Sequence, residues 1–321
     1  MAQDINVMLY GLGAIGSFYA FILERTKRVR LTVVARSNYE AVREDRKVWL
    51  VLLFIWSRAD RQPTVVRTPA EAGETYDYVV CAHKAINQES TAKQLAPAVD
   101  ENNTCIVIIQ NGVGNEDAFR ELFPKCTILS CVTWVGASQD SPGIVNHWKS
   151  ENTEIGLFPN PSLDAASEQT RLNEFTSLLR EGKTPFSVED NVQIQRWSKV
   201  IWNCAWNSLT TLTMLDTHSW LKSSPDSTPM TRRLMQEVID VARACDVPIK
   251  DGLIDELLEK ILAMQPIGSS MQTDCKMGRP MEVEIILGTP VRKGRELHVA
   301  TPILEVLYTL LSAINTRMKP V

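Results

Sequence analysis

The chain has 321 residues, of which 44% are hydrophobic and 22% are charged, and its formal net charge is −4. This length suits two domains of ordinary size, and the composition is typical of a globular protein. The slightly negative charge gives no electrostatic reason to expect nucleic acid or an anionic membrane as a partner, so we expect neither.

The cysteines and histidines argue against a disulfide framework and a metal centre. Seven cysteines show no CxxC pair, and four histidines are scattered. The N-terminus, "MAQDINVMLYG", reads as the start of a strand and not as a signal peptide. We therefore expect reduced thiols, a cytoplasmic location and no metal. The longest apolar run, Val48–Trp56, is too short to span a bilayer and predicts a buried strand, with an exposed apolar segment as the alternative.

The first elements predict a dinucleotide site. A strand over Ile5–Tyr10 is followed by "GLGAIG" at Gly11–Gly16, a helix to about Glu24, and a second strand over Leu31–Arg36. Strand, G-x-G-x-x-G, helix and strand form the context that this motif requires. The predicted cofactor-binding residues of the motif are Gly11, Leu12, Gly13, Ala14, Ile15 and Gly16. The alternative is a glycine-rich turn without a ligand.

Each glycine has a distinct expected task. Gly11 lets the chain turn tightly, Gly13 lets the backbone approach a pyrophosphate, and Gly16 lets the helix pack closely on the sheet. The helix N-terminus then offers N–H groups to the phosphates. Arg36 stands where an NAD site usually carries an acidic residue, so it favours NADP through its 2′-phosphate, unless it is an ordinary surface arginine.

Three further apolar runs suit a parallel sheet that is covered on both faces: Tyr76–Lys84, Thr104–Gly114 and Ile128–Ala137. Their carboxyl ends carry Lys84, Asn111 and the Gly136–Ala137 turn, and such ends line the ligand crevice of a doubly wound sheet. We therefore expect Lys84 to meet a phosphate and Asn111 to reach the nicotinamide side. The alternative is that Lys84 and Asn111 are solvated loop residues.

Two more strand-like segments follow, "GIVNHW" at Gly143–Trp148 and "TEIGLF" at Thr153–Phe158. We expect them to form a hairpin that is appended to the sheet. "PFSVE" at Pro185–Glu189 is a last strand-like segment before the pattern changes to the helical period.

The second half predicts helices. Their expected ranges are 192–213, 229–246, 250–263, 281–297 and 302–316. "TPM" at Thr228–Met230 and "TPI" at Thr301–Ile303 each suggest a cap followed by proline at the first helical position. The predicted fold is therefore α/β, with a Rossmann-type doubly wound domain at residues 1–189 and an all-helical domain at residues 190–321.

A polar stripe lies within the first of these helices. Lys199, Asn203 and Asn207 recur at four-residue steps among tryptophans in "RWSKVIWNCAWN", so they share one helix face. In partly dry surroundings a lysine gives up its proton more readily, and amides can bind substrate hydroxyl groups. The alternative is a solvent-facing stripe with tryptophans behind it. Downstream, Ser269 and Ser270 suit either helix capping or carboxylate binding, and Glu282 lies early on the next helix.

Taken together, these residues resemble the 2-dehydropantoate 2-reductase (ketopantoate reductase) family over nearly the full length. The resemblance rests on five segments: "GLGAIG", "HKAINQ" (His83–Gln88), "QNGVGNED" (Gln110–Asp117), "KVIWNCAWN" (Lys199–Asn207) and "SSMQTD…MEVE" (Ser269–Glu284).

The resemblance implies a Rossmann domain joined to a helical domain and NADPH as the hydride donor. It implies that the substrate is a small 2-oxo acid, 2-dehydropantoate, which is reduced at C2 to pantoate. It implies Lys199 as general acid and Glu282 as a catalytic carboxylate. The implied substrate-binding residues are Asn111, Lys199, Asn203, Asn207 and Ser270. Lys84, Asn111 and Ala137 are implied on the cofactor side. A homodimer is compatible with the sequence.

The chain departs from the family pattern at Ser208, where many members have proline, at Thr217, where some place a substrate asparagine, and over Arg46–Gln62. These departures concern the choice of substrate more than the fold. Two alternatives therefore stay open: a related NADPH-dependent reductase of another 2-oxo acid or ketone, and a non-catalytic NADP-binding or sensing protein.

Overall fold

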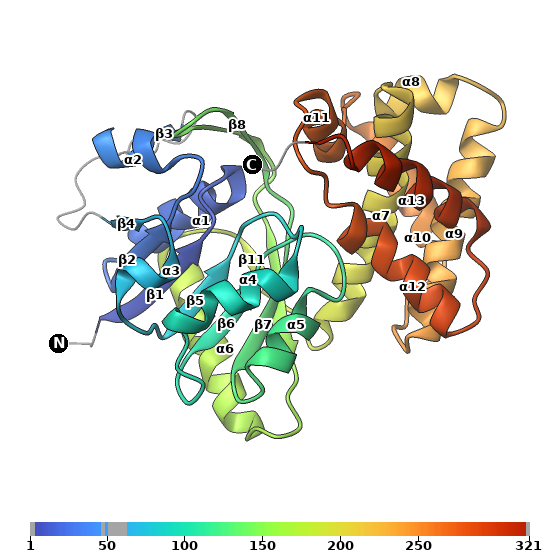
Figure 1. The fold of residues 1–321 in the computed structure, drawn as a ribbon. Coiled ribbons are helices and arrows are strands. Elements are labelled where there is room, and N and C mark those ends of the chain that lie inside the picture. Colours follow the sequence, from blue (N-terminus) through green and yellow to red (C-terminus); the bar gives the residue numbers. More distant parts are fainter. Residues whose placement is uncertain (1–3, 46–48, 51–62, 319–321) are drawn as a thin grey trace. The chain divides into compact units, whose positions relative to one another are not determined.

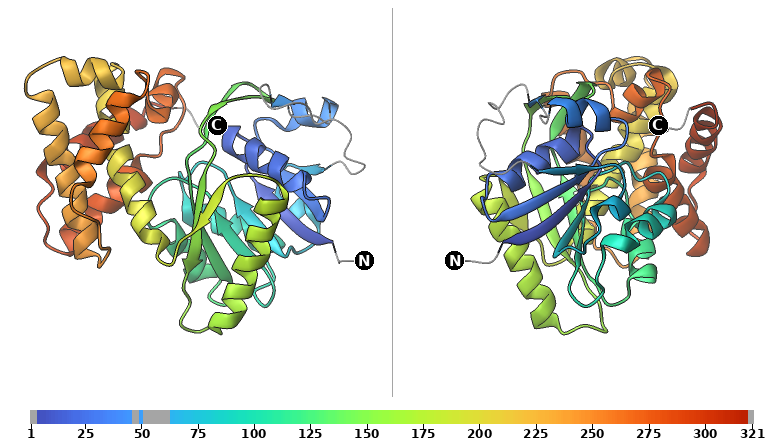
Figure 2. Two further views of the ribbon diagram at one scale, coloured as in Figure 1. Left: turned by 180° about the vertical axis from the view of Figure 1, so that it is seen from behind. Right: turned by 60° about the vertical axis from the view of Figure 1, so that its left-hand side comes forward.

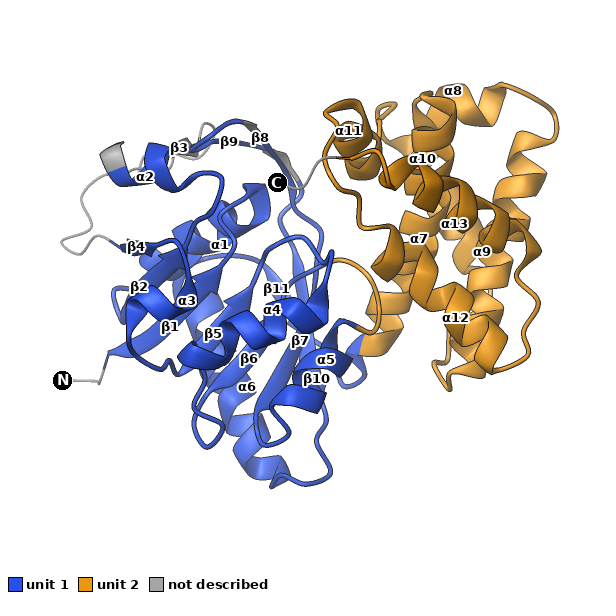
Figure 3. Ribbon diagram, in the orientation of Figure 1, with its two compact units in different colours: residues 1–110, 115–192 blue, residues 111–114, 193–321 orange. Residues whose placement is uncertain are grey.

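The structure is a computed structural model of the chain and describes residues 4–45, 49–50 and 63–318. The chain divides into two compact units (Figure 3). Unit 1 consists of Met1–Gln110 and Asn115–Val192, and unit 2 consists of Asn111–Gly114 and Gln193–Val321. The short segment Asn111–Gly114 therefore belongs with the second half of the chain, although it lies within the first half of the sequence.

Unit 1 is built on one large sheet with the strand order β11-β10-β7-β6-β5-β1-β2-β4. All neighbouring strands are parallel except β10, which runs antiparallel to β7. The strands are β1 Ile5–Tyr10, β2 Val29–Val34, β4 Thr64–Val66, β5 Tyr78–Cys81, β6 Cys105–Ile108, β7 Thr127–Thr133, β10 Thr153–Phe158 and β11 Phe186–Val188. The strand order reverses between β1 and β5, so the ligand crevice of this fold is expected at their carboxyl ends.

Helices cover both faces of this sheet (Figures 1 and 2). On one face lie α1 (Ala14–Glu24) and α6 (Ala165–Glu181), and on the other lie α3 (Pro69–Ala72), α4 (Gln88–Leu95), the 3₁₀ turn η1 (Ala96–Ala98) and α5 (Asn115–Leu122), while α2 (Tyr39–Asp45) follows β2. Strand residues alternate between two apolar cores: Val7 and Leu9 of β1 pack into one, and Met8 into the other. Because both faces are buried, the strands appear in the sequence as continuous apolar runs.

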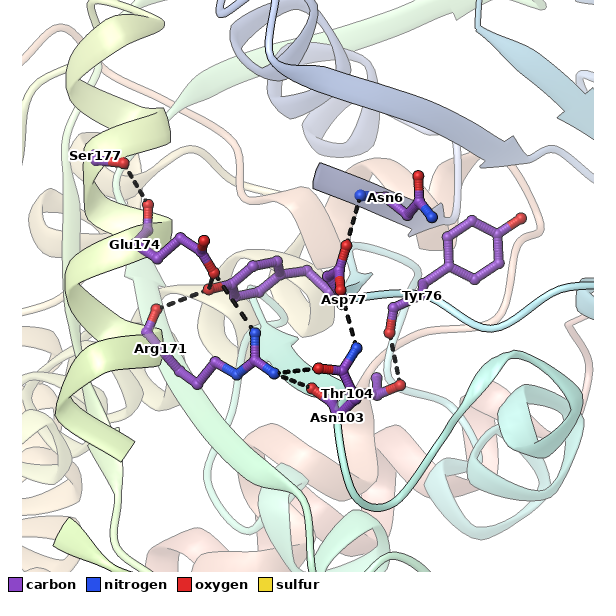
Figure 4. Close-up of polar contacts among 9 residues, drawn as sticks. Asn6, Tyr76, Asp77, Asn103, Thr104, Arg171, Glu174 and Ser177 are labelled. Atoms are coloured by element: carbon purple, nitrogen blue, oxygen red, sulfur yellow. Dashed lines mark hydrogen bonds and ion pairs between the residues drawn. The ribbon is translucent and has the colours of Figure 1, made fainter. Parts of the chain in front are cut away.

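The amino-terminal edge of the sheet is closed by polar contacts (Figure 4). Asp77 accepts hydrogen bonds from the backbone N–H of Asn6 at 2.8 Å and from Asn103 Nδ2 at 2.9 Å. Arg171 of α6 donates to the carbonyl of Asn103 at 2.7 Å, and the hydroxyl of Tyr78 donates to the carbonyl of Arg171 at 3.0 Å. These contacts tie α6 to β5 and β6 at the edge opposite the expected crevice.

The predicted hairpin between Gly143–Trp148 and Thr153–Phe158 is wrong. β9 (Ile144–Lys149) pairs instead with β8 (Gly136–Ser141) in a separate small sheet that also contains β3 (Trp49–Leu50). β10 joins the main sheet beside β7, with Thr153 opposite Thr133. The reason is burial. β7 is buried along its whole length and needs a covering neighbour at this edge, whereas in β9 Val145 and His147 are buried and Ile144 and Asn146 are more exposed, which suits a one-sided ribbon. Apart from β3, the apolar run Val48–Trp56 lies outside the described residues.

Unit 2 is helical. Its elements are α7 Val192–Thr213, α8 Thr217–Lys222, α9 Ser227–Ala244, α10 Leu253–Ala263, α11 Ser270–Lys276, the π-helical turn η2 Glu284–Gly288, α12 Thr289–Glu296 and α13 Pro302–Asn315. The predicted fold class, a doubly wound sheet followed by a helical domain, is confirmed. Within the described residues, no helix combines the length and the hydropathy needed to cross a bilayer.

Some details of the predicted helices are wrong. The helix expected over 281–297 is present as continuous helical residues 283–296, but its first part is the π-helical turn η2, and α8 and α11 are additional. Asp226, not Thr228, precedes α9, because the helix begins at Ser227. Pro302 does stand at the start of α13, but Thr301 before it makes no side-chain capping bond.

Candidate functional site

The glycine turn after β1 fits a bound diphosphate. Gly11 has φ +101°, and a Cβ there would lie 2.7 Å from the Cα of His83. A Cβ on Gly16 would lie 1.9 Å from the carbonyl oxygen of Gly11, so α1 packs directly on the turn. A Cβ on Gly13 would meet no atom within 4 Å. The turn therefore leaves open space beside Gly13, at a helix N-terminus that no side chain caps.

The remaining residues of the motif support this turn. Leu12 is buried, and its carbonyl accepts a hydrogen bond from the side-chain amide of Asn38, which follows β2. Ala14 and Ile15 are partly buried at the start of α1 and pack against the core of unit 1. The structure thus brings the motif together with the loop after β2 and, through His83, with the loop after β5.

Arg36 is exposed, two residues beyond the end of β2. Its guanidinium carbon lies 5.9 Å from the ring centroid of Tyr10, and that ring meets the ring of His83 edge-on at 4.7 Å. Burial, followed by the positive field of Arg36, lowers the pKa of His83 to about 3. His83 is therefore neutral at physiological pH, and Arg36 presents a cation at the edge where a 2′-phosphate is expected.

An amide chain joins the loops after β5 and β6. Nε2 of Gln88 donates to Oε1 of Gln110 and to Oδ1 of Asn115, each at 2.8 Å. The side-chain amide nitrogen of Gln110 lies 3.0 Å from Nε2 of His83 and donates to its carbonyl at 3.0 Å. The predicted cofactor residue Lys84 is exposed on this loop. Ala137 lies on β8 and packs, partly buried, against the core, and its predicted role at the cofactor stays a prediction.

In unit 2 the structure brings Asn111 and Glu282 together. Nδ2 of Asn111 donates to Oε2 of Glu282 at 3.3 Å. Glu282 directly precedes the helical residues that lead into η2, and both residues are partly buried. Asn111, which was predicted to contact both cofactor and substrate, thus forms a hydrogen bond with the predicted catalytic residue Glu282.

The stripe on α7 is confirmed as one face of a single helix. Lys199 is partly buried, whereas Asn203 and Asn207 are 8% and 4% exposed. Nδ2 of Asn207 is buried without a hydrogen-bond partner. A buried donor that lacks an acceptor is costly, so an acceptor from a ligand would stabilise it. This stripe is not the solvated face that the sequence left open for the two asparagines.

Contacts at both ends of the stripe fix its surroundings within unit 2. One turn before Lys199, Arg196 donates to the carbonyl of Gly112 at 2.9 Å, next to Asn111. Beyond Asn207, the hydroxyl of Thr210 donates to Oγ of Ser269 at 2.7 Å. Arg196 and Thr210 thus connect α7 to the Asn111–Gly114 segment at one end and to the start of α11 at the other.

The two serines differ in their surroundings. Ser269 is buried and caps α11 by accepting a hydrogen bond from the backbone N–H of Gln272 at 3.0 Å. Ser270, the predicted substrate-binding residue, is the exposed first residue of α11. Ordinary capping therefore explains Ser269, and the role of Ser270 stays a prediction.

Sequence reasoning missed Arg196. Arg196 is 2% exposed, and its side chain contacts the segment that carries Asn111. A cation inside the aromatic stretch "RWSKVIWNCAWN" was the available signal, because buried cations require partners.

The described residues contain no group of three or more histidine, cysteine, aspartate or glutamate side chains that could hold a metal ion. All seven cysteines are free, and burial raises the pKa of the Cys204 thiol. Cys204 therefore stays a thiol, and its Sγ donates to the carbonyl of Ile286 at 3.0 Å.

A doubly wound sheet with a glycine turn at its switch point, joined to a helical unit with a lysine, amides and a carboxylate, defines a dinucleotide-linked oxidoreductase. Residues 7–160 match the family model described as ketopantoate reductase PanE/ApbA, and residues 191–315 match the model of its C-terminal part. The chain belongs to the ketopantoate reductase family, whose members are oxidoreductases.

Individual relatives agree with this assignment. The crystal structure of 2-dehydropantoate 2-reductase from Methylococcus capsulatus is 30% identical, with a TM-score of 0.84 and 98% of each chain covered. A 2-dehydropantoate 2-reductase of Nostoc sp. is 24% identical over 96% of this chain and 95% of its own. A D-mandelate dehydrogenase in a ternary structure with NADH and anilino(oxo)acetate shares the fold, with a TM-score of 0.84, 21% identity and coverage of 98% and 99%.

Proposed function

We propose that this protein reduces the C2 ketone of 2-dehydropantoate to pantoate with NADPH, as a step toward pantothenate and coenzyme A. The observation that carries the proposal is the Lys199–Asn203–Asn207 face of α7, with its buried and unpartnered Asn207 amide. This face lies in the same unit as the Asn111–Glu282 pair.

Lys199 is the proposed general acid. Reduction of a ketone places negative charge on its oxygen, and an ammonium group held near that oxygen stabilises the charge and then donates a proton. General acid catalysis of this kind contributes about 10²–10⁴-fold to the rate. The partial burial of Lys199 supports this role, because electrostatic stabilisation is stronger where water is excluded.

The amides and the carboxylate are the proposed orienting groups. Asn203 and Asn207 hold the hydroxyl and carboxylate oxygens of the substrate, with Ser270 at the neighbouring helix start. Asn111 is held by Glu282 and contacts both substrate and cofactor. When these groups hold the substrate ketone in the correct orientation toward the hydride donor, the entropic part of the activation free energy is lower.

The proposed cofactor is NADPH, which supplies the hydride when bound. Gly11–Gly16 would hold its diphosphate, and the open space beside Gly13 supports this assignment. Arg36 would pair with the 2′-phosphate, Lys84 would meet a phosphate, and Ala137 would lie at the cofactor. Family membership further supports a cytoplasmic enzyme, and we propose a homodimer by analogy with the ketopantoate reductase of Staphylococcus aureus, whose structure is titled dimeric.

One observation favours a second candidate, reduction of a different 2-oxo acid. Thr217 stands where some family members place a substrate asparagine, and it is fully buried. Its backbone N–H donates to the carbonyl of Ile267 at 3.0 Å, and its hydroxyl accepts from the N–H of Ile267 at 3.4 Å. Thr217 is thus engaged in holding this loop and does not supply an amide, which changes the expected preference among 2-oxo acids.

The test follows NADPH absorbance with purified protein and a panel of 2-oxo acids that includes 2-dehydropantoate and an aryl 2-oxo acid. We expect turnover of 2-dehydropantoate and a loss of about 10²–10⁴-fold in kcat in Lys199→Ala. Lys276→Ala, an exposed lysine on α11 of the same unit, is the matched control and should keep full activity. Turnover of only another ketone would favour the second candidate, and tight NADPH binding without turnover would indicate a non-catalytic protein.

A further inference from the structure

The π-helical turn η2 leaves one backbone carbonyl without a donor in its own helix. The N–H of Thr289 donates to the carbonyl of Glu284, five residues earlier, which is the π pattern. The carbonyl of Ile285 would then need an N–H from residue 290, but that residue is Pro290, which has none. The carbonyl of Ile285 is therefore available to another part of the chain.

The segment Asn111–Gly114 uses this carbonyl. The backbone N–H of Val113 donates to the carbonyl oxygen of Ile285 at 3.2 Å. Gly112 permits the close approach: its φ is +96°, and a Cβ there would lie 2.5 Å from the same oxygen. On its other side the segment is held by Arg196, whose guanidinium donates to the carbonyl of Gly112 at 2.9 Å.

The contacts made by Gly112 and Val113 hold Asn111 in place. Asn111 is directly bonded to it in the chain, and its side-chain amide meets Glu282, which lies just before η2. A shift of about 1 Å at a reacting group can cost about 10²-fold in rate, so the anchoring of this segment matters for any reaction that uses Asn111.

We propose that Arg196 is a positioning residue, which together with the π-helical turn at Glu284–Gly288 holds the Asn111 amide on Glu282. This inference rests on the proposed function, because it assigns Arg196 a role in the reaction through Asn111. Arg196 is assigned no contact with substrate or cofactor and acts through Asn111.

A double-mutant cycle tests the inference. Arg196→Met should lower kcat/KM by about 10- to 100-fold, the range expected for one charge-assisted hydrogen bond. In an Asn111→Ala background the same change should cost less than about 3-fold, because the residue through which Arg196 acts is gone. Arg196→Lys, which retains a cationic donor, should restore part of the activity.

Arg243→Met is the matched control. Arg243 also donates to a backbone carbonyl of unit 2, that of Ile249 at 2.9 Å, and should leave kcat/KM unchanged in both backgrounds. Equal losses from Arg196→Met with and without Asn111 would overturn the inference, since they would indicate a purely structural effect.

Hydrogen exchange gives a readout that does not depend on the substrate. Arg196→Met should accelerate exchange of the Val113 amide by about tenfold or more, and so should Pro290→Ala, because an N–H at position 290 competes for the carbonyl of Ile285. Exchange at Val107 of β6 should stay unchanged. Unaltered exchange at Val113 in both variants would overturn the inference, whereas absence of turnover by the unmodified protein would overturn only the proposed function.

Discussion

The side-chain amide of Asn111 lies 3.3 Å from Oε2 of Glu282, although the two residues are 171 positions apart in the sequence. Asn111 follows a strand of the Rossmann-type unit, but the segment that contains it packs with the helical unit. The pair therefore joins one of the sheet-end residues predicted at the cofactor to the predicted catalytic carboxylate within a single compact unit.

Glu282→Gln tests the charge in this pair. The amide keeps the shape of the side chain but weakens the hydrogen bond, because a bond to a charged group is worth about 1.5–3 kcal/mol and a neutral one about 1. We expect kcat/KM to fall by about tenfold or more in steady-state assays. Glu259→Gln, an exposed glutamate on α10, is the control. Unchanged kinetics in Glu282→Gln would remove this carboxylate from the reaction.

Gly13→Ala and Gly16→Ala should affect different properties, the first NADPH binding and the second stability. A Cβ on Gly13 enters open space, so Gly13→Ala should fold normally but weaken NADPH binding by about tenfold or more, because the methyl group occupies the approach to the diphosphate. A Cβ on Gly16 would lie 1.9 Å from the carbonyl of Gly11, so Gly16→Ala should lower the thermal midpoint markedly. Thermal unfolding and NADPH fluorescence titration measure the two effects. Normal NADPH affinity in Gly13→Ala would contradict the assignment.

Arg36→Gln should shift the cofactor preference. Loss of the guanidinium removes a charge-assisted contact to the 2′-phosphate, so the ratio of kcat/KM for NADPH to that for NADH should fall by about 10- to 100-fold. Arg30 lies near the amino end of β2, the strand that Arg36 follows, and it bonds Asn6 and Glu74. Arg30→Gln should therefore leave the ratio unchanged. If Arg36→Gln, like Arg30→Gln, kept the NADPH-to-NADH ratio of the unmodified protein, Arg36 would be excluded from the cofactor site.

Much of this structure could be predicted from local patterns in the sequence. The glycine turn could be predicted because the requirement for Gly11, Gly13 and Gly16 arises within six consecutive residues and their flanking strands. The stripe on α7 could be predicted because helical spacing alone places Lys199 and Asn207 on one side. Both features depend only on the conformation of a short stretch of chain, so the spacing of residues in the sequence is enough to predict them.

Contacts between residues far apart in the sequence, and the pairing of strands, could not be predicted in the same way. Residues 144–149 and Thr153–Phe158 suggest a hairpin because they are adjacent in the sequence. In the structure β10 (Thr153–Phe158) pairs instead with the buried strand β7 in the main sheet. The anchoring of Asn111 depends on the carbonyl of Ile285, which becomes available only when the helix adopts the π pattern. Pro290 was visible in the sequence, but it indicates a missing donor and not the partner that replaces it.

Asn207→Ala should separate stability from function. Nδ2 of Asn207 is buried without a partner, so removing the amide relieves a desolvation cost of about 1–3 kcal/mol and offsets the loss of packing. We expect the urea midpoint to stay within experimental error while kcat/KM falls by about tenfold or more. Thr210→Val is the comparison, because that hydroxyl is paired with Ser269 at 2.7 Å and its loss should lower the midpoint. Full activity in Asn207→Ala would exclude a role in substrate binding.

The buried ring of His83 should make stability depend on pH. Burial, and then the field of Arg36, lowers the pKa of His83 to about 3, whereas an unfolded histidine titrates near 6.5. Between these values the unfolded chain binds more protons. The contribution is therefore fully present above about pH 6.5 and is lost on acidification by up to about 1.4 kcal/mol per pH unit. Urea unfolding of the protein and of His83→Gln at pH 7.5, 6.0 and 5.0 should show a shallower pH dependence in the variant.

Two comparisons isolate this effect. His298 is exposed and has φ +58°, a conformation that asparagine tolerates, so His298→Asn should keep the original pH dependence. Burial raises the pKa of Glu24 to about 7, which gives a contribution of opposite sign, because the native state then binds the extra proton between about pH 4.5 and 7. Glu24 is present in every one of these proteins, so its contribution cancels in the difference between them. An identical pH dependence with and without His83 would show that this ring is not held neutral by the fold.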